Sequence, residues 1–224
     1  MSLYISKRLE AIASLVEEGS IVADIGADHG SLAIGLIKSG KCKKVFAVEN
    51  KKGPYLRLKQ NVSSAGVLDG VELSLSDGIE CLPQYCDTLV LAGMGGLLIK
   101  NIIGNHKNKL VNIKTIIIDP HREDRLIYQH LASMGYKMED SVFLKEKNIY
   151  YCVSKWIKND KEVIYSEEEL EYGPIGIHTK DNMWKEWIAN KIETNRRIME
   201  DSDIPDSLRK ELADKNQFME ELIK

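Results

Sequence analysis

Acidic and glycine residues follow short apolar segments, at the positions where an open parallel sheet binds its ligands. The first such cluster is Asp24-Ile25-Gly26-Ala27-Asp28-His29-Gly30. Gly26 allows a tight turn and a close approach of the backbone to a ligand. The spacing D-x-G-x-x-x-G differs from the G-x-G-x-x-G that presents backbone amides to a pyrophosphate. Asp24 therefore suits a ligand that carries an ammonium group, unless it only caps the following turn.

Acids also follow the next two apolar segments. Glu49 comes roughly 20 residues after the first cluster, the spacing of a residue that binds a ribose. An ionised carboxylate has two acceptor oxygens, so Glu49 can accept hydrogen bonds from both ribose hydroxyls. Asp77, in Asp77-Gly78, can accept the amino group of an adenine. These acids together suit a nucleoside that carries an ammonium group and no phosphate. S-adenosylmethionine (SAM) is such a molecule, and we expect it as the cofactor.

A glycine-rich segment, Ala92-Gly93-Met94-Gly95-Gly96, follows the fourth apolar segment. Its glycines leave backbone groups bare beside the expected transfer site, and we expect Gly93 and Met94 to line the cofactor site. Many amino-methyltransferases carry Asn/Asp-Pro-Pro-Tyr/Phe here, which holds the target amine and stacks its base. This chain has neither the acid nor the aromatic residue, so the segment argues against transfer to an exocyclic amine.

The elements that position these residues alternate between strands and helices. An amphipathic helix with Ile5, Leu9, Ile12 and Val16 on one face opens the chain and stops at Gly19. Short apolar strands then alternate with helices, which predicts a parallel sheet covered on both faces. The predicted strands are 21–25, 44–48, 71–75, 88–91 and 115–118, and the predicted helices end near 38, 66, 103 and 134.

Two strand-like runs, 136–145 and 149–156, close this part of the chain with only three residues between them. No helix fits in that gap, so the runs should form an antiparallel hairpin. The fold class is therefore α/β, with a Rossmann-like class I methyltransferase sheet that ends in an antiparallel hairpin. NAD-binding Rossmann domains usually lack that ending, and the missing G-x-G-x-x-G also argues against an NAD-dependent oxidoreductase.

The remainder of the chain is predicted to be a separate helical part. Residues 1–157 form the SAM-binding domain, 158–180 a linker, and 181–224 an antiparallel, coiled-coil-like helical hairpin. Trp184 and Trp187 fit the core of that hairpin, or its junction with the first domain, better than an RNA-stacking platform, which is the alternative.

Length and composition agree with a globular α/β domain plus an appendage. The chain has 224 residues, 43% hydrophobic and 29% charged, and no run long enough to cross a bilayer. The N-terminus lacks a signal-peptide layout, and the four cysteines form no C-x-x-C pair, so we expect a cytoplasmic protein without a metal site. Residues 1–159 hold 21 Lys and Arg against 17 Asp and Glu, whereas 160–224 hold 10 against 17. The first part is thus mildly basic, and the tail is acidic.

The chain resembles the bacterial tRNA (adenine-22-N1)-methyltransferases from end to end. The resemblance rests on Ser6-Lys7-Arg8-Leu9, Asp24 to His29, Gly53-Pro54, Asp77-Gly78, Ala92 to Gly96 and Gly173-Pro174. It implies a class I SAM-dependent enzyme that methylates N1 of one adenine in the D-arm region of tRNA. One segment departs from the family, which has Gln-Pro-Asn after the fifth strand where this chain has Asp119-Pro120-His121.

Candidate catalytic groups follow from the chemistry of adenine N1. Methylation leaves a cationic adenine, which a carboxylate would stabilise, and Asp28 is the candidate. His29 could hold the base or accept a proton, although it could equally orient the loop through hydrogen bonds. His121 is a weaker candidate of the same kind.

Basic residues near the predicted cofactor edge are the candidates for contact with tRNA phosphates, although each could be ordinary surface. They are Lys7, Arg8, Lys51, Lys52 and Arg57, with Lys41, Lys43 and Lys44 as further candidates. We expect tRNA as the partner of a monomer that is not associated with a membrane. The alternatives are a SAM-dependent enzyme acting on another RNA base or a small molecule, or a non-catalytic tRNA-binding protein that keeps the fold.

Overall fold

The computed structural model describes residues 6–159, 161 and 163–224, so the expectation for Ile5 lies outside the described residues. The chain divides into two compact units, Met1–Tyr165 and Ser166–Lys224. Among the described residues, none of the helices is long and apolar enough to span a membrane.

The first helix, α1 (Lys7–Leu15), begins where the Ser6 hydroxyl accepts a hydrogen bond from the Leu9 amide at 3.2 Å. Of the predicted apolar face, Ile12 and the C-cap residue Val16 are buried and Leu9 is half-buried; Leu15 is also buried, although it was not part of that face.

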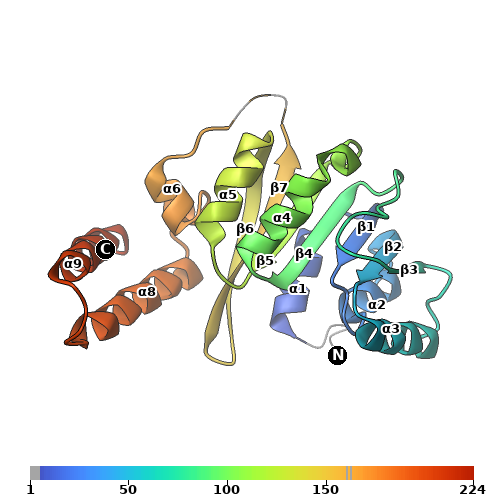
Figure 1. Ribbon diagram of the computed structural model, residues 1–224, viewed down its shortest axis with the longest axis horizontal. Helices are drawn as coiled ribbons and strands as arrows, with labels where there is room; N and C mark the ends of the chain where they lie inside the picture. Colours follow the sequence, from blue (N-terminus) through green and yellow to red (C-terminus); the bar gives the residue numbers. More distant parts are fainter. Residues whose placement is uncertain (1–5, 160, 162) are drawn as a thin grey trace. The chain divides into compact units, whose positions relative to one another are not determined.

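Seven strands form one sheet in the order β3-β2-β1-β4-β5-β7-β6 (Figure 1). The first five run parallel, β7 runs antiparallel to β5, and β6 runs antiparallel to β7. The predicted sheet that ends in an antiparallel hairpin is therefore confirmed. The strands are β1 Ser20–Ile25, β2 Cys42–Glu49, β3 Val71–Leu75, β4 Thr88–Met94, β5 Thr115–Pro120, β6 Tyr136–Glu146 and β7 Ile149–Lys158.

Helices cover both faces of this sheet. On one face, α1, α2 and α3 pack against the strands in a single apolar cluster that includes Leu36, Leu58 and Val90. On the other face lie α4 and α5, which are in front of the sheet in Figure 1. The helices of this unit are α2 Ser31–Lys38, α3 Lys52–Ser64, α4 Gly96–Asn105, the short 3-10 helix η1 Lys107–Leu110, and α5 Asp124–Ser133.

The segment predicted to be a linker, 158–180, is more ordered than its composition indicates. It contains α6 (Glu167–Tyr172) and α7 (Gly176–Thr179). Ser166 and Glu169 form a reciprocal capping box at the start of α6. The first unit extends to Tyr165, past the predicted end at residue 157, and the Tyr165 hydroxyl accepts a hydrogen bond from the Met138 amide at 2.8 Å.

The second unit also holds α8 (Asn182–Glu200) and α9 (Asp206–Leu222), which form the predicted helical hairpin. Asn195 donates to the Asn216 side chain at 2.8 Å, and Arg196 pairs with Glu220 at 2.7 Å. Asn216 is buried and Asn195 is half-buried, so this hydrogen bond helps to fix the register of the two helices, because a slip would leave the buried amide unpaired. Trp184 is fully buried and donates to the Tyr172 carbonyl at 2.7 Å within this unit.

Candidate active site

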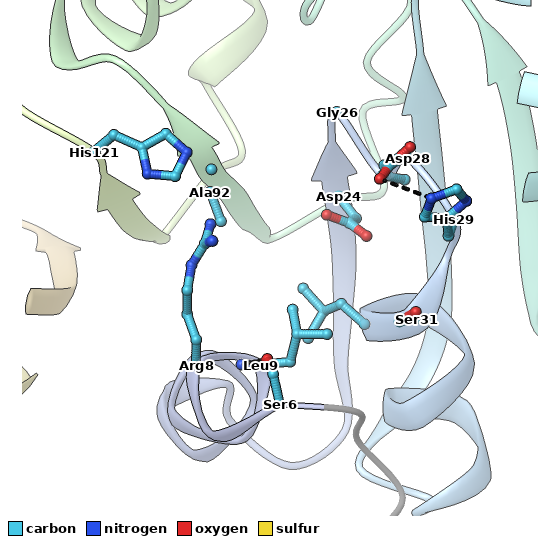
Figure 2. Close-up of a pocket in the computed structure, with 13 residues that line it drawn as sticks. Ser6, Arg8, Leu9, Asp24, Gly26, Asp28, His29, Ser31, Ala92 and His121 are labelled. Atoms are coloured by element: carbon cyan, nitrogen blue, oxygen red, sulfur yellow. Dashed lines mark hydrogen bonds and ion pairs between the residues drawn. The ribbon is translucent and has the colours of Figure 1, made fainter. Parts of the chain in front are cut away.

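Two cavities open at the carboxyl ends of the parallel strands and meet at Gly26 and Asp28. The first, of about 340 Å³, is here named the Asp24 cavity and is drawn in Figure 2. The second, of about 250 Å³, is named the Glu49 cavity. The predicted cofactor residues all line one or both: Asp24, Gly26, Asp28, His29 and Gly93 in the first, and Gly26, Asp28, Glu49, Asp77, Gly78 and Met94 in the second.

Asp24 stands near the end of β1 with its side chain buried at one wall of its cavity. Within the described part of the chain, its Oδ2 atom has no hydrogen-bond partner. Burial raises the pKa of Asp24 to about 7, because the charged form loses its hydration. A buried acceptor without a partner is costly, so its place beside a cavity fits a ligand that brings a donor or a positive charge.

Glu49 ends β2 and is also buried, but its carboxylate is hydrogen-bonded. Oε1 accepts from the Lys51 amide at 2.9 Å, and Oε2 accepts from the Asp28 amide at 3.3 Å. A carboxylate offers about four acceptor sites, so two remain for the hydroxyls of a ribose. The contact with Asp28 also ties the turn after β1 to the end of β2, which fixes the point where the two cavities meet.

The far end of the Glu49 cavity combines an acid with apolar walls. Asp77 accepts from the Asn50 side-chain amide at 3.2 Å and keeps further acceptor capacity. Val48, Leu98 and Ile102 supply apolar surface on the same cavity. This combination suits a flat heterocycle with an exocyclic amino group, and the two cavities together offer one end for an ammonium group and one for an adenine.

Asp28 and His29 lie together at the rim. The Asp28 Oδ2 atom is 3.4 Å from His29 Nε2, the contact drawn as a dashed line in Figure 2. Both side chains are at least half exposed. Asp28 has a φ of 46°, in the left-handed region that residues other than glycine seldom adopt. Strain of this kind often marks a functional turn, and here it directs a carboxylate to the junction of the cavities.

Arg8 was expected on the surface as a contact for tRNA phosphates, but its side chain lies at the Asp24 cavity. Its guanidinium lines the Asp24 cavity, forms an ion pair with Asp119 and lies 5.1 Å from the centre of the Tyr151 ring. A β-carbon on Gly93 would lie 2.8 Å from Arg8 Nη2, so the glycine makes room for the arginine. Arg8 therefore belongs to the site, with the buried Asp119 behind it, and the sequence did not predict this pair because α1 and β5 are far apart in the chain.

Asp119 is wholly buried, and burial raises its pKa while the Arg8 charge opposes that rise. Its Oδ1 atom has no hydrogen-bond partner among the described residues. His121 lies on the cavity wall, and its backbone amide donates to the Met94 carbonyl at 3.0 Å. In the sequence, only the departure from the family pattern at Asp119-Pro120-His121 pointed to Asp119 and His121.

The other basic candidates are not gathered into the cavities as a set. Lys7, Lys52 and Arg57 are exposed, and Lys51 reaches the Glu49 cavity beside its backbone contact with Glu49. Of the further candidates, Lys41 donates to the Ser14 carbonyl at 3.0 Å, and Lys44 pairs with Glu72 at 2.6 Å. These two are engaged in contacts within the protein, while Lys43 is exposed.

Known proteins resemble this chain over its full length. The tRNA (adenine(22)-N(1))-methyltransferase of Bacillus subtilis (strain 168) is 29% identical over 99% of this chain and 98% of its own. The solved structure of the B. subtilis M1A22 tRNA methyltransferase TrmK is 27% identical, with a TM-score of 0.85 over 99% of this chain and 100% of that chain. A Streptococcus pneumoniae structure in complex with S-adenosyl-L-methionine is 26% identical, with a TM-score of 0.89 over 98% of this chain and 100% of that chain.

A family described as "Methyltransferase domain" matches residues 5–154. That range contains every strand up to the middle of β7 and every residue that lines the two cavities. The chain therefore belongs to the methyltransferase-domain family.

Proposed function

We propose that this chain is a SAM-dependent methyltransferase that modifies N1 of adenine 22 in tRNA. The observation that carries the proposal is the full-length likeness to the B. subtilis enzyme of that activity, combined with a pair of cavities that fits SAM. The resemblance in the motifs of the two cavities points to the same conclusion.

The cofactor, when bound, supplies an electrophilic methyl group on a sulfonium. The chain's own residues would hold it at three points: the Asp24 carboxylate at the ammonium group, Glu49 at the ribose and Asp77 at the adenine amino group. The unpartnered Asp24 Oδ2 supports this assignment, because an ammonium group would satisfy it.

Adenine N1 is a good nucleophile once it is free of base pairing, so the main task of the protein is alignment. A near-attack geometry of about 3–3.5 Å supplies much of the rate. The target base must leave its stack, at a cost of a few kcal/mol. In this proposal the Asp28 carboxylate at the cavity rim stabilises the cationic product, and His29, 3.4 Å from it, orients the base or the loop.

The test is direct. Unmodified tRNA is incubated with the purified chain and SAM, and mass spectrometry locates any methyl group by nucleoside and position. N1-methyladenosine at position 22 is expected. A methyl group elsewhere would favour the alternative of another RNA base. No transfer, in a chain that binds SAM by calorimetry, would favour a small-molecule substrate.

The proposal also covers the oligomeric state and the cellular compartment of the enzyme. The enzyme acts as a monomer in the cytoplasm, where its four free cysteines remain reduced. Sedimentation of the purified chain at micromolar concentration tests the monomer, and a stable dimer would overturn it.

A further inference from the structure

The β6–β7 hairpin projects beyond the rest of the sheet. Pairing between β5 and β7 runs from Thr115 with Ile157 to Ile118 with Ser154 and stops there. The ribbon continues to the pair of Glu146 with Ile149, five residues further along β7. At about 3.3 Å per residue, the ribbon extends roughly 15 Å past its last pair with β5, and about 10 Å past Pro120, where β5 ends. Figure 1 shows the ribbon extending past the neighbouring strands.

This overhang lies at the edge of the sheet that carries the cavities. Because β7 is antiparallel to β5, the beginning of β7 lies at the carboxyl end of β5. The Tyr151 ring of the overhang contacts the Arg8 guanidinium, which lines the Asp24 cavity. Glu146 accepts a hydrogen bond from the Lys7 amide at 2.9 Å, which joins the hairpin to the start of α1. The hairpin is thus held beside the cavity mouth.

The end of the hairpin, residues 145–150, is here named the tip, and its chemistry is cationic and aromatic. Lys145 lies 4.6 Å from the centre of the Tyr150 ring and donates to its hydroxyl at 2.9 Å. Lys147 is exposed at the turn, and 55% of Ile149 is exposed. The acid of the tip, Glu146, is occupied by the first turn of α1.

The turn of the hairpin has Lys147 at a position whose backbone conformation favours Asn or Gly. Lys147 and Asn148 form a two-residue loop with φ values of 48° and 64°. A loop with two positive φ values strongly prefers Asn and Gly, so Asn148 suits it and Lys147 does not. Backbone strain at an exposed position, where no packing requires a lysine, supports a functional reason for the charge.

We propose that the tip is an RNA-docking element that binds the phosphates next to the target nucleotide. This rests on the proposed function, since it assumes tRNA as the substrate. A nucleotide that enters the cavity mouth brings its flanking phosphates close to the projecting hairpin. Lys145 and Lys147 are the cations for those phosphates, and Tyr150 and Ile149 offer apolar surface to a base that has lost its stacking neighbour.

The test uses the full chain with two substitutions chosen to preserve the hairpin. Lys147→Asn removes the charge and improves the fit to the turn, and Lys145→Gln removes the charge while keeping most of the side-chain length. Lys137→Gln is the matched control. Lys137 is also an exposed lysine of β6, but it lies near the start of that strand, far from the tip. Affinity for unmodified tRNA is measured by fluorescence anisotropy at several salt concentrations, and affinity for SAM by calorimetry.

The double variant should bind tRNA about tenfold more weakly than the native chain. The slope of log affinity against log salt should become shallower by roughly one unit for each phosphate that is no longer neutralised. SAM affinity and the Lys137→Gln variant should match the native chain.

Native tRNA affinity and slope in the double variant would overturn the proposal, as would an equal loss of affinity in the control. The binding assay does not depend on turnover. If the native chain binds tRNA but does not methylate position 22, the proposed function is refuted, and the binding of the double variant still tests the role of the tip. A chain that binds no tRNA refutes both.

Discussion

Arg8 and Asp119 lie 111 residues apart in the sequence and form an ion pair between α1 and β5, with the guanidinium on the cavity and the carboxylate wholly buried. The pair connects the first helix to the strand end that carries His121. A buried carboxylate without its partner is much less stable than an arginine that can turn towards solvent, so the two partners are not equivalent.

That asymmetry predicts unequal costs of substitution. Arg8→Ala should lower the free energy of unfolding by about 3–5 kcal/mol, because it leaves Asp119 buried and unpaired. Asp119→Ala should cost less, about 1–3 kcal/mol, since the Arg8 side chain is 21% exposed and can reach water. Urea denaturation of both single variants and the double variant measures these costs. Additive losses would mean that the two charges do not interact.

Gly93 is predicted to be required for the position of Arg8. Gly93→Ala adds a β-carbon 2.8 Å from Arg8 Nη2, at a residue whose φ is 75°. Gly40→Ala is the matched control, because Gly40 has a φ of 71° and no heavy atom within 4 Å of the added carbon. Both variants should lose about 1 kcal/mol of stability from the strained backbone. Only Gly93→Ala should also reduce tRNA methylation at saturating SAM, and equal activity of the two variants would contradict the steric argument.

Asp24 predicts a dependence of stability on pH. Its pKa is about 7 in the folded chain against 3.8 for an ordinary aspartate, so the folded chain binds more protons than the unfolded chain between these values. Stability of the cofactor-free protein should therefore fall as pH rises from about 4 to 7, by at most about 4 kcal/mol from this group. Urea denaturation across that range should show a flatter dependence in Asp24→Asn.

The same carboxylate makes SAM binding depend on pH in the opposite direction. An ammonium group favours the ionised form of Asp24, so SAM affinity should increase as pH rises from about 5 to about 7 and binding should release a proton. Calorimetry in two buffers of different ionisation enthalpy measures that proton. Affinity that does not change with pH in the native chain would remove Asp24 from the ammonium end of the site.

Much of this site could be predicted because its residues follow strand ends. Asp24, Glu49 and Asp77 come directly after or at the end of apolar segments, and parallel strands bring such ends to one edge. The part that could not be predicted depends on contacts between distant segments: Arg8 with Asp119 and Tyr151, and the overhang of the hairpin. Local periodicity indicates a strand but not its register against a neighbour, so the strand ends alone could not reveal how far β7 extends past β5.

Asp28 is expected to act on the chemical step more than on cofactor binding. Its contact with Glu49 is made by the backbone amide, so Asp28→Ala removes the rim carboxylate and keeps that hydrogen bond. The variant should lower the single-turnover rate by about tenfold or more, with SAM affinity changed by less than about threefold. Native single-turnover rates would leave alignment as the whole mechanism. Glu72→Gln, at an exposed ion pair on β3, is a control for removal of a carboxylate elsewhere.

The division of labour between the two units is tested by truncation after Tyr165. The Tyr165 hydroxyl accepts from the Met138 amide, and its ring packs edge-on against Trp156 at 6.0 Å, so residues 1–165 keep an interaction that residues 1–157 lack. The longer piece should fold and bind SAM with the affinity of the full chain, because both cavities lie within it. The shorter piece should be less stable by about 1–3 kcal/mol, since it exposes Trp156 and leaves the Met138 amide unpaired.

Residues 1–165 should nevertheless lose most tRNA methylation. The helical unit has an acidic balance, so its contribution to the substrate would come from a few positioned groups and from shape, and correct placement of one adenine is worth orders of magnitude in rate. Single-turnover assays on tRNA with both chains measure the difference. Full activity of residues 1–165 would reduce the second unit to a stabilising element, whereas failure of this piece to fold would mean that the two units share one core.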